Sequence, residues 1–436
     1  MNFRLRTLTA SIALLGTAGV AHAAGFNLLE QNNSGLGNAY AGSAAVAENA
    51  STTYFNPAGL TQLDGLQIST GVSFIRPGFK FTDKGTTMPA VLPGVAKGGT
   101  GGDAGGWAAV PNLYMSYKLN DRVALGLGIS APFGLKTEYE SDWMGRYHSR
   151  SFDIKTININ PSVAFKVDPS FSVGLGLNIQ RIEATYEKAT PVPLLHPASG
   201  TLLGFASGDA KTKVKNTGYG WNIGLLYHPS ADTRIGLSYR SRIKHKADGD
   251  TTLDFKVPTA AGLVPMNVNS VSAATVSLPD MAILSGYHRL NDKWEIMGDV
   301  SWTGWSSLPK LTITNAKLPE TTLQLHFKDS WRIAVGANYA VNDAWKIKAG
   351  FAWDQSPVRH TEHRLASLPD SNRYWLSLGA QFKPTANTTL DVGYAYIIAD
   401  KSKVNNNNAN AAAYGTLKGS YKADSHVFGL QLSHRF

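Results

Sequence analysis

The sequence predicts an all-β fold, a 14-stranded antiparallel transmembrane β-barrel. Three observations support this prediction. A secretory signal begins the chain, amphipathic segments of about ten residues or more follow one another from Leu66 to Phe436, and short turns alternate with long loops between them. This regular alternation of turns and loops is typical of outer-membrane barrels and is not expected of a β-sandwich.

The first residues have the three parts of a signal peptide. Arg4 and Arg6 precede an apolar run over residues 8–20, and Ala21-His22-Ala23 has the small-x-small pattern of a cleavage site, with cleavage after Ala23. The run is too short to span a membrane as a helix. We therefore expect residues 1–23 to be removed after export.

A segment without strand periodicity, residues 24–65, separates the signal from the strands. It is rich in Gly, Ala, Ser and Asn. Asn56 can cap a helix and Pro57 suits the first helical position, so a short helix is expected over residues 56–63. These residues fit a separate domain outside the barrel and a plug inside it equally well.

Fourteen amphipathic segments make up the rest of the chain, residues 66–436. Ten residues at a rise of about 3.3 Å, tilted by about 45°, cover about 23 Å, which is close to the apolar band of an outer membrane. The segments are 66–76, 109–119, 122–139, 149–167, 171–188, 211–228, 233–246, 269–290, 293–306, 324–340, 344–356, 371–383, 388–404 and 416–436.

The connections between these segments alternate strictly in length. Turn-forming residues such as Asn120-Asp121, Asn291-Asp292 and Asn342-Asp343 make the short ones. The long connections are expected at 77–108, 140–148, 189–210, 247–268, 307–323, 357–370 and 405–415. With an even number of strands, both ends of the barrel lie on the short-turn side, which faces the periplasm.

The side chains of each strand divide into an apolar and a polar face, as in a barrel with a wet interior. In 233–246, Ile235, Leu237, Tyr239 and Ile243 alternate with Arg240, Arg242 and Lys244. In 324–340, Leu325, Phe327 and Trp331 alternate with Lys328 and Arg332. We therefore expect Arg240, Arg242, Lys244, Lys328 and Arg332 to point into the lumen, where they solvate it, pair with carboxylates or bind a substrate carboxylate.

Composition and motifs exclude several functions. Cysteine is absent, and the net charge of +10 on an exported chain favours lipopolysaccharide or an anionic substrate over nucleic acid. His360-Thr361-Glu362-His363 departs from a zinc-binding helix motif in order and spacing, and the glycine run 98–106 lacks the rest of a phosphate loop. No enzyme signature, metal site or cofactor is predicted.

The third strand contains a proline, which is unusual in a closed sheet. Pro132 and the neighbouring Gly134 interrupt the segment 122–139. Proline removes a hydrogen bond from the ladder, and a nearby glycine favours a bulge. The interruption is either a kink near the loop-side rim or a gap in the wall.

Short sequence motifs, in order along almost the whole mature chain, resemble the FadL-type outer-membrane transporters of long-chain fatty acids and hydrocarbons. They are Ala24-Gly25-Phe26, Ser34-Gly35-Leu36-Gly37-Asn38-Ala39-Tyr40, Asn56-Pro57-Ala58, Pro132-Phe133-Gly134-Leu135, Leu278-Pro279, Ser301-Trp302-Thr303-Gly304-Trp305, Phe327-Lys328-Asp329-Ser330-Trp331-Arg332, Asp354-Gln355-Ser356-Pro357-Val358 and Leu368-Pro369-Asp370.

The resemblance implies that residues 24–65 form a hatch that plugs the lumen of the barrel formed by residues 66–436. It implies capture of a hydrophobic substrate among the external loops, binding beside the hatch, and lateral release at the third strand. The implied residues are Asn56, Pro57 and Ala58 in the hatch, Pro132, Phe133 and Gly134 at the gap, and Lys328, Lys188 and Phe26 at the substrate, with Arg332 and Arg240 as further inward cations.

The leading hypothesis is therefore a passive importer of long-chain fatty acids in the outer membrane of a Gram-negative bacterium, monomeric by resemblance, without cofactor. It would contact outer-membrane lipid and lipopolysaccharide. The same fold importing neutral aromatic or alkane hydrocarbons is the alternative. A general porin and an outer-membrane hydrolase are hypotheses of other classes.

Overall fold

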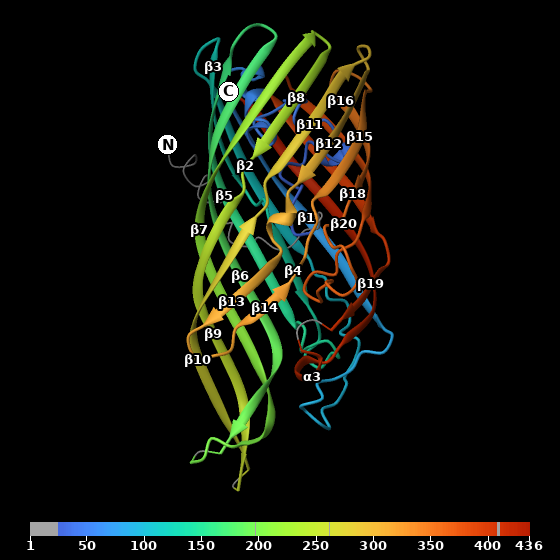
Figure 1. Cartoon of the computed structure of the whole chain (residues 1–436). Coiled ribbons are helices and arrows are strands. Elements are labelled where there is room, and N and C mark those ends of the chain that lie inside the picture. Colours follow the sequence, from blue (N-terminus) through green and yellow to red (C-terminus); the bar gives the residue numbers. More distant parts are fainter. Residues whose placement is uncertain (1–24, 197, 261, 408–409) are drawn as a thin grey trace.

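The computed structural model describes residues 25–196, 198–260, 262–407 and 410–436, so the predicted signal peptide lies outside the described residues. Within these ranges, all strands belong to one antiparallel sheet. The sheet closes on itself because the first strand, β1 (Leu66–Asp83), pairs with the last, β20 (Leu417–Arg435). Figure 1 shows the resulting barrel of tilted strands.

Over the described residues, the strands form the fourteen barrel-spanning segments that the sequence predicts, here called staves. Six staves are interrupted, and each of these consists of two consecutive strands separated by a break. The remaining strands are β2 (Ala108–Lys118), β3 (Val123–Ser130), β4 (Gly134–Glu138), β5 (Ser151–Lys166), β6 (Phe171–Leu195), β7 (Leu202–Ser230), β8 (Thr233–Arg240), β9 (Ile243–Thr259), β10 (Gly262–Leu278), β11 (Met281–Arg289), β12 (Trp294–Thr303), β13 (Lys310–Asn315), β14 (Thr321–Gln324), β15 (Ser330–Ala340), β16 (Trp345–Asp354), β17 (Arg373–Thr385), β18 (Thr388–Ala399) and β19 (Ser402–Asn406).

Two of the predicted long loops are wrong, because the strands on either side continue through them, and a third, 307–323, contains β13 and most of its paired strand β14. β6 and β7 pair from Phe171↔Tyr227 as far as Leu195↔Leu202, and β9 and β10 pair to Gly262↔Thr259. Residues 189–210 and 247–268 therefore form mainly long β-ribbons. The ribbons extend past the rest of the barrel at the end opposite the short turns (Figure 1).

Aromatic side chains mark two levels on the outer surface. Near the short turns Trp294 contacts Tyr339, with ring centroids 4.8 Å apart, and eight residues further along β12 Trp302 lies opposite Trp331. Eight residues at about 3.3 Å each give about 26 Å along the strand, or about 19 Å in height at a tilt of about 45°. This height lies within the apolar band of about 25 Å that aromatic girdles flank in an outer-membrane barrel. None of the helices in the described ranges has the length and apolar character needed to span a bilayer.

The predicted orientation of the side chains is wrong after the break between β8 and β9. Arg240 points inward and is buried, as predicted, but Ile243 is also buried while Arg242 and Lys244 are exposed. The break shifts the period-2 pattern by one residue, and such a shift exchanges the two faces of a strand. Arg242 and Lys244 therefore point outward, not into the lumen.

A second shift lies between β14 and β15. Leu325 and Phe327 are buried inside the barrel, whereas Trp331 is 49% exposed on its outside. The prediction that these three side chains share the lipid-facing side is wrong. The shift brings apolar side chains into the lumen, where the pattern alone led us to expect polar ones.

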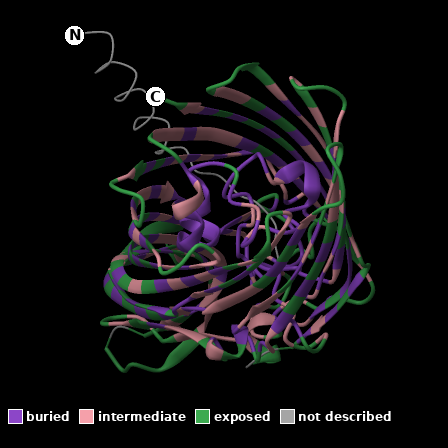
Figure 2. Ribbon diagram, turned by 90° about the horizontal axis from the view of Figure 1, so that it is seen from above, coloured by how far each residue is buried: buried purple, intermediate pink, exposed green. Residues whose placement is uncertain are grey.

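The amino-terminal residues 25–65, the hatch, lie inside the barrel. They contain η2 (Leu36–Asn38), α2 (Thr52–Phe55) and η3 (Pro57–Gln62). The predicted capped helix is confirmed as the 3₁₀ helix η3, in which Asn56 Oδ1 accepts a hydrogen bond of 3.0 Å from the backbone N–H of Ala58. Seen along the barrel, buried residues fill much of the space that the strands enclose (Figure 2).

The hatch backbone lies directly against glycines of the wall. A Cβ atom added to Gly350 on β16 would be 2.1 Å from the carbonyl carbon of Asn38. One added to Gly174 on β6 would be 2.2 Å from the backbone nitrogen of Ala58. Both separations are far below van der Waals contact, so a side chain at either position would displace the hatch.

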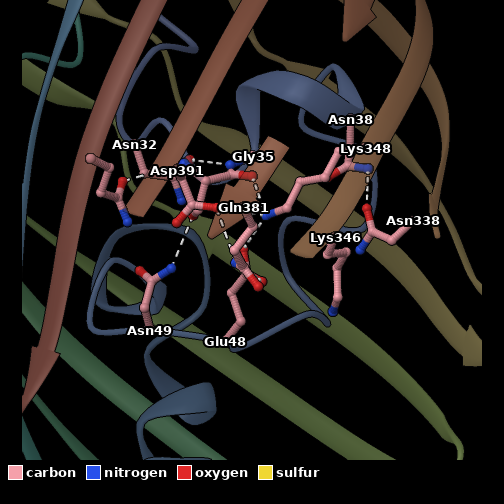
Figure 3. Close-up of polar contacts among 12 residues, drawn as sticks. Asn32, Gly35, Asn38, Glu48, Asn49, Asn338, Lys346, Lys348, Gln381 and Asp391 are labelled. Carbon is pink, nitrogen blue, oxygen red and sulfur yellow. Dashed lines mark hydrogen bonds and ion pairs between the residues drawn. The ribbon is translucent and has the colours of Figure 1, made fainter. Parts of the chain in front are cut away.

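Buried polar contacts also join the hatch to the wall (Figure 3). Lys348 on β16 donates to the carbonyl oxygen of Ser34 at 2.8 Å and pairs with Glu48 at 3.1 Å and with Asp391 on β18 at 3.0 Å. A buried cation with two carboxylate partners is costly to separate from either of them. This network therefore holds the hatch to strands β16 and β18.

We predict that Gly350→Ala destabilises the barrel by about 1–3 kcal/mol, because the added methyl group overpacks the contact with Asn38. The temperature at which the folded form is lost on unboiled SDS gels measures this effect. Gly286→Ala on β11 is the matched control, since a Cβ there meets no atom within 4 Å. Equal transition temperatures for both variants would show that the contact with the hatch is not tight.

Candidate functional site

An apolar cavity of about 710 Å³, its open mouth included, lies in the lumen. Phe26 of the hatch, Leu135 on β4 and Val276 on β10 line it, together with Leu325 and Phe327 from the segment between β14 and β15. Tyr186, Thr212 and Ser367 contribute the polar side-chain atoms of its lining. The cavity has the apolar lining of a small-molecule binding site, and among the described residues no charged side chain lines it.

Four aromatic rings form one side of this region. The ring of Phe26 lies 4.7 Å from that of Trp305 and 6.0 Å from that of Phe133, and Phe327 lies 5.9 Å from Trp305. All three pairs are edge-to-face, the arrangement that aromatic quadrupoles favour. The cluster therefore joins the cavity lining, at Phe26 and Phe327, to Phe133 in the interrupted third strand.

The third strand is interrupted as predicted, and the wall is open beside the interruption. β3 pairs with β2 over residues 113–118, and β4 pairs with β5. Among the described residues, positions 108–112 of β2 pair with β1 but have no strand partner on their other side. Unpaired edges within a closed barrel are unusual, because closure normally satisfies every strand.

The start of the hatch occupies the edge of the third strand that faces β2. Leu28 N donates to Pro132 O at 2.8 Å, and Gly134 N donates to Phe26 O at 2.9 Å. Phe133 is bonded on the opposite edge, to Thr156 of β5. Residues 26–28 therefore act as a short additional strand that closes the opening from the lumen side.

At the outer end of the cavity lies Lys188 on β6. Two outward grooves, of about 810 and 1050 Å³, share Lys188, and Tyr186 lines both grooves and the cavity. The Lys188 ammonium lies 4.3 Å from the ring centre of Tyr414, a cation–π contact. Among the described residues it forms no ion pair with a carboxylate. Lys188 thus lies in a partly enclosed site that Glu320 also lines, and it has no ion-pair partner among the described residues.

His148, in the loop between β4 and β5, lines the same groove. Burial, with a further contribution from the positive charge of Lys188, lowers the pKa of His148 to about 4. The imidazole is therefore neutral at neutral pH. Lys188 is then the cation that a ligand in this groove would meet.

Two other predicted cations are bound to the hatch. Arg240 donates to the carbonyl oxygen of Tyr54 at 2.8 Å and lies over its ring. Arg332 pairs with Asp299 at 3.5 Å and donates to the carbonyl oxygen of Ala39. The structure therefore brings Arg240 and Arg332 together with the hatch and not with the apolar cavity.

The remaining predicted residues lie in two places. Lys328 is partly exposed beside the cavity-lining Phe327, and its backbone N–H bonds to Pro357. Asn56 donates to the carbonyl oxygens of Ala44 and of Leu225 on β7, and Pro57 and Ala58 follow it against the wall. The motif Asn56-Pro57-Ala58 therefore anchors the hatch, away from the cavity.

Several lining residues were not identified from the sequence. Tyr186, Leu325 and Tyr414 come from three different segments, and no motif connects them. Among the described residues, no group of three or more His, Asp or Glu side chains has an arrangement that could hold a metal ion. The ring of His363, from the motif His360-Thr361-Glu362-His363, lies 4.3 Å from that of His326, which is outside the motif.

Comparison with known proteins shows similarity over almost the whole chain. Residues 14–436 match the family model of the outer membrane protein transport proteins (OMPP1/FadL/TodX). The chain is 32% identical to outer membrane protein P1 of Haemophilus influenzae, over 97% of this chain and 98% of that one. It is 31% identical to the long-chain fatty acid transport protein of Escherichia coli K12, over 92% and 94% of the two chains.

Solved structures agree with the fold. The crystal structure of a FadL homologue from Pseudomonas aeruginosa is 25% identical and superposes with a TM-score of 0.84, covering 95% of this chain and 100% of that one. The toluene transporter TbuX of Ralstonia pickettii is 18% identical, with a TM-score of 0.67 over 94% and 100% of the two chains, and shows the shared fold. Homologues in this family are outer-membrane transporters and channels, not enzymes. The chain therefore belongs to the OMPP1/FadL/TodX family of outer-membrane transport proteins.

Proposed function

We propose that this protein imports long-chain fatty acids passively through the outer membrane. The observation that carries the proposal is Lys188, a cation without a carboxylate partner among the described residues, at the outer end of an uncharged apolar cavity. A molecule with one anionic end and a long apolar chain matches both features. The Escherichia coli relative is named for long-chain fatty acid transport, which agrees with this substrate class.

The energetics favour such a ligand. Each buried CH₂ group contributes about 0.8 kcal/mol, so a long acyl chain gains far more from the apolar cavity than from a watery pore. A charge-assisted bond from Lys188 would hold the carboxylate. Arg240 and Arg332 are less suited to this role, because their guanidinium groups already bind hatch carbonyl oxygens.

The proposed route runs from the outward grooves past Lys188 into the cavity, and then to the opening beside the third strand. A straight axial route is unfavourable, because the hatch backbone lies against wall glycines such as Gly350 and Gly174. A lateral exit needs a smaller change. The contacts of residues 26–28 with Pro132 and Gly134 must break, and the aromatic contact of Phe26 with Phe133 must open.

Lateral release also suits the chemistry of the ligand. An acyl chain that moves from the cavity through the wall enters the apolar core of the bilayer without a second transfer into water. The driving force is the concentration gradient, so the proposed mechanism uses neither nucleotide nor metal.

Import of neutral hydrocarbons is the second candidate. The uncharged lining of the cavity favours it, and transporters of toluene share the fold. Such a substrate needs no cationic partner. Lys188 therefore separates the two candidates.

We predict that Lys188→Met weakens oleate binding by roughly 10- to 100-fold, the effect of losing one charge-assisted hydrogen bond. Binding to purified protein and uptake of labelled oleate and labelled dodecane by complemented deletion cells measure this. Dodecane uptake should not change. Lys383→Met, at the exposed periplasmic turn, is the matched control.

Two results would contradict this assignment. Unchanged oleate binding in Lys188→Met would exclude Lys188 as the carboxylate site, and Lys328→Ala tested in parallel shows whether Lys328 serves instead. Equal loss of oleate and dodecane uptake in Lys188→Met would indicate a damaged structure and not a lost charge.

We further predict that the double variant Asn27→Cys/Phe133→Cys transports only when reduced. The chain has no other cysteine, and Asn27 and Phe133 form an antiparallel bridge. Their Cα atoms are therefore close enough for a disulfide. Oxidation should stop uptake and spare oleate binding, and dithiothreitol should restore uptake. Uptake by the oxidised, fully cross-linked protein would contradict release beside the third strand.

A further inference from the structure

Lysines gather on the outer surface of the barrel just beyond the aromatic girdle, on the side formed by β7 and β9. They are Lys215 on β7 and Lys244 and Lys246 on β9, and all three are exposed. Their direction is fixed by their neighbours. His245 is buried and bonded to Gln180 within the lumen, and Val214 lines the apolar cavity. The lysines alternate with these residues and therefore point away from the lumen.

Two aromatic side chains give the height of the lysines relative to the membrane. Trp221 on β7 and Tyr239 on β8 are outward-facing, with ring centroids 5.4 Å apart, at the girdle distal to the short turns. Tyr219, two residues further along β7, is 73% exposed. In the register of β7 and β9, Lys215 lies opposite Asp248. When this register is continued toward the short turns, Lys244 lies opposite Tyr219 and Lys246 lies opposite Thr217. The two lysines therefore lie about 7 and 13 Å along the strand from the level of Trp221, where lipid headgroups begin.

The three ammonium groups can reach a common ligand. Lys244 and Lys246 are two residues apart on one face, and Lys215 is diagonal to Lys246, so each neighbouring pair is separated by about 7–8 Å at the backbone. None of the three forms an ion pair among the described residues. Two carboxylate residues on the neighbouring strands lie opposite Lys215, Glu183 on β6 and Asp248 on β9. Glu183 forms an ion pair with Arg181 at 2.9 Å.

We propose that Lys215, Lys244 and Lys246 form a binding site for the phosphate groups of the glycolipid in the outer leaflet of the outer membrane. Clustered lysines at the membrane surface attract anionic headgroups. The site faces the bilayer and not the lumen, so a lipid reaches it directly, and it lies apart from Lys188 and the proposed transport route. The site would hold one phosphorylated lipid against the outer surface of the paired strands β7 and β9, where they leave the membrane.

The first test compares two double variants of the full-length protein purified from outer membranes. Lys244→Gln/Lys246→Gln should carry less bound phosphorylated glycolipid, by roughly fivefold for each lysine removed. Lys293→Gln/Lys383→Gln, at exposed periplasmic turns, should carry the same amount as the unaltered protein. Phosphate analysis and mass spectrometry of the extracted lipid measure both. Lys244→Arg/Lys246→Arg should retain the lipid.

The second test identifies the recognised group. Bisphosphorylated lipid A added to delipidated protein in detergent should raise the temperature of barrel unfolding, and dephosphorylated lipid A should not. Inorganic phosphate at equal concentration should have no effect, since it lacks the acyl chains that anchor the lipid beside Trp221. Three results would overturn the proposal. They are equal amounts of glycolipid in the two glutamine variants, equal stabilisation by dephosphorylated lipid A, and stabilisation by inorganic phosphate.

Discussion

The fit of the hatch against the wall is the constraint on which the rest of the structure depends. Gly350 and Gly174 allow the hatch backbone to approach the strands more closely than any side chain would permit. Lys348 adds a buried ion pair between the two parts. The hatch fills part of the lumen and leaves an apolar cavity beside it, and residues 26–28 pair with the third strand at the interruption before β4.

The apolar cavity and the outward-facing lysines of β9 have a common origin in the interruptions of the staves. A strand that breaks and resumes one residue out of phase exchanges its inner and outer faces. Between β14 and β15 the exchange brings Leu325 and Phe327 inward to line the cavity. Between β8 and β9 it sends Lys244 outward, toward lipid. A shift of one residue at a break therefore makes the interior locally apolar at one place and adds basic side chains to the exterior at another.

The cations of the lumen differ in what already binds them. Arg240 and Arg332 donate to hatch carbonyl oxygens, and Lys348 contacts two carboxylates, so these groups stabilise the plugged barrel. Lys188 contacts an aromatic ring, which leaves its ammonium free to bind an anion. Charge alone does not distinguish a cation that holds the hatch from one that has no carboxylate partner. The contacts of each cation among the described residues do.

The sequence by itself determined the barrel, its fourteen staves, the capped helix at Asn56 and the irregular third strand, because each is encoded in a local pattern of side chains or turn residues. It also placed Pro132 at the interruption. Only the tertiary structure decided which residues line the cavity, that the start of the hatch pairs with the third strand, and that Arg242 and Lys244 face outward. The physical reason is that a shift of one residue at a break reverses every later side chain, and the sequence does not show where the shift occurs.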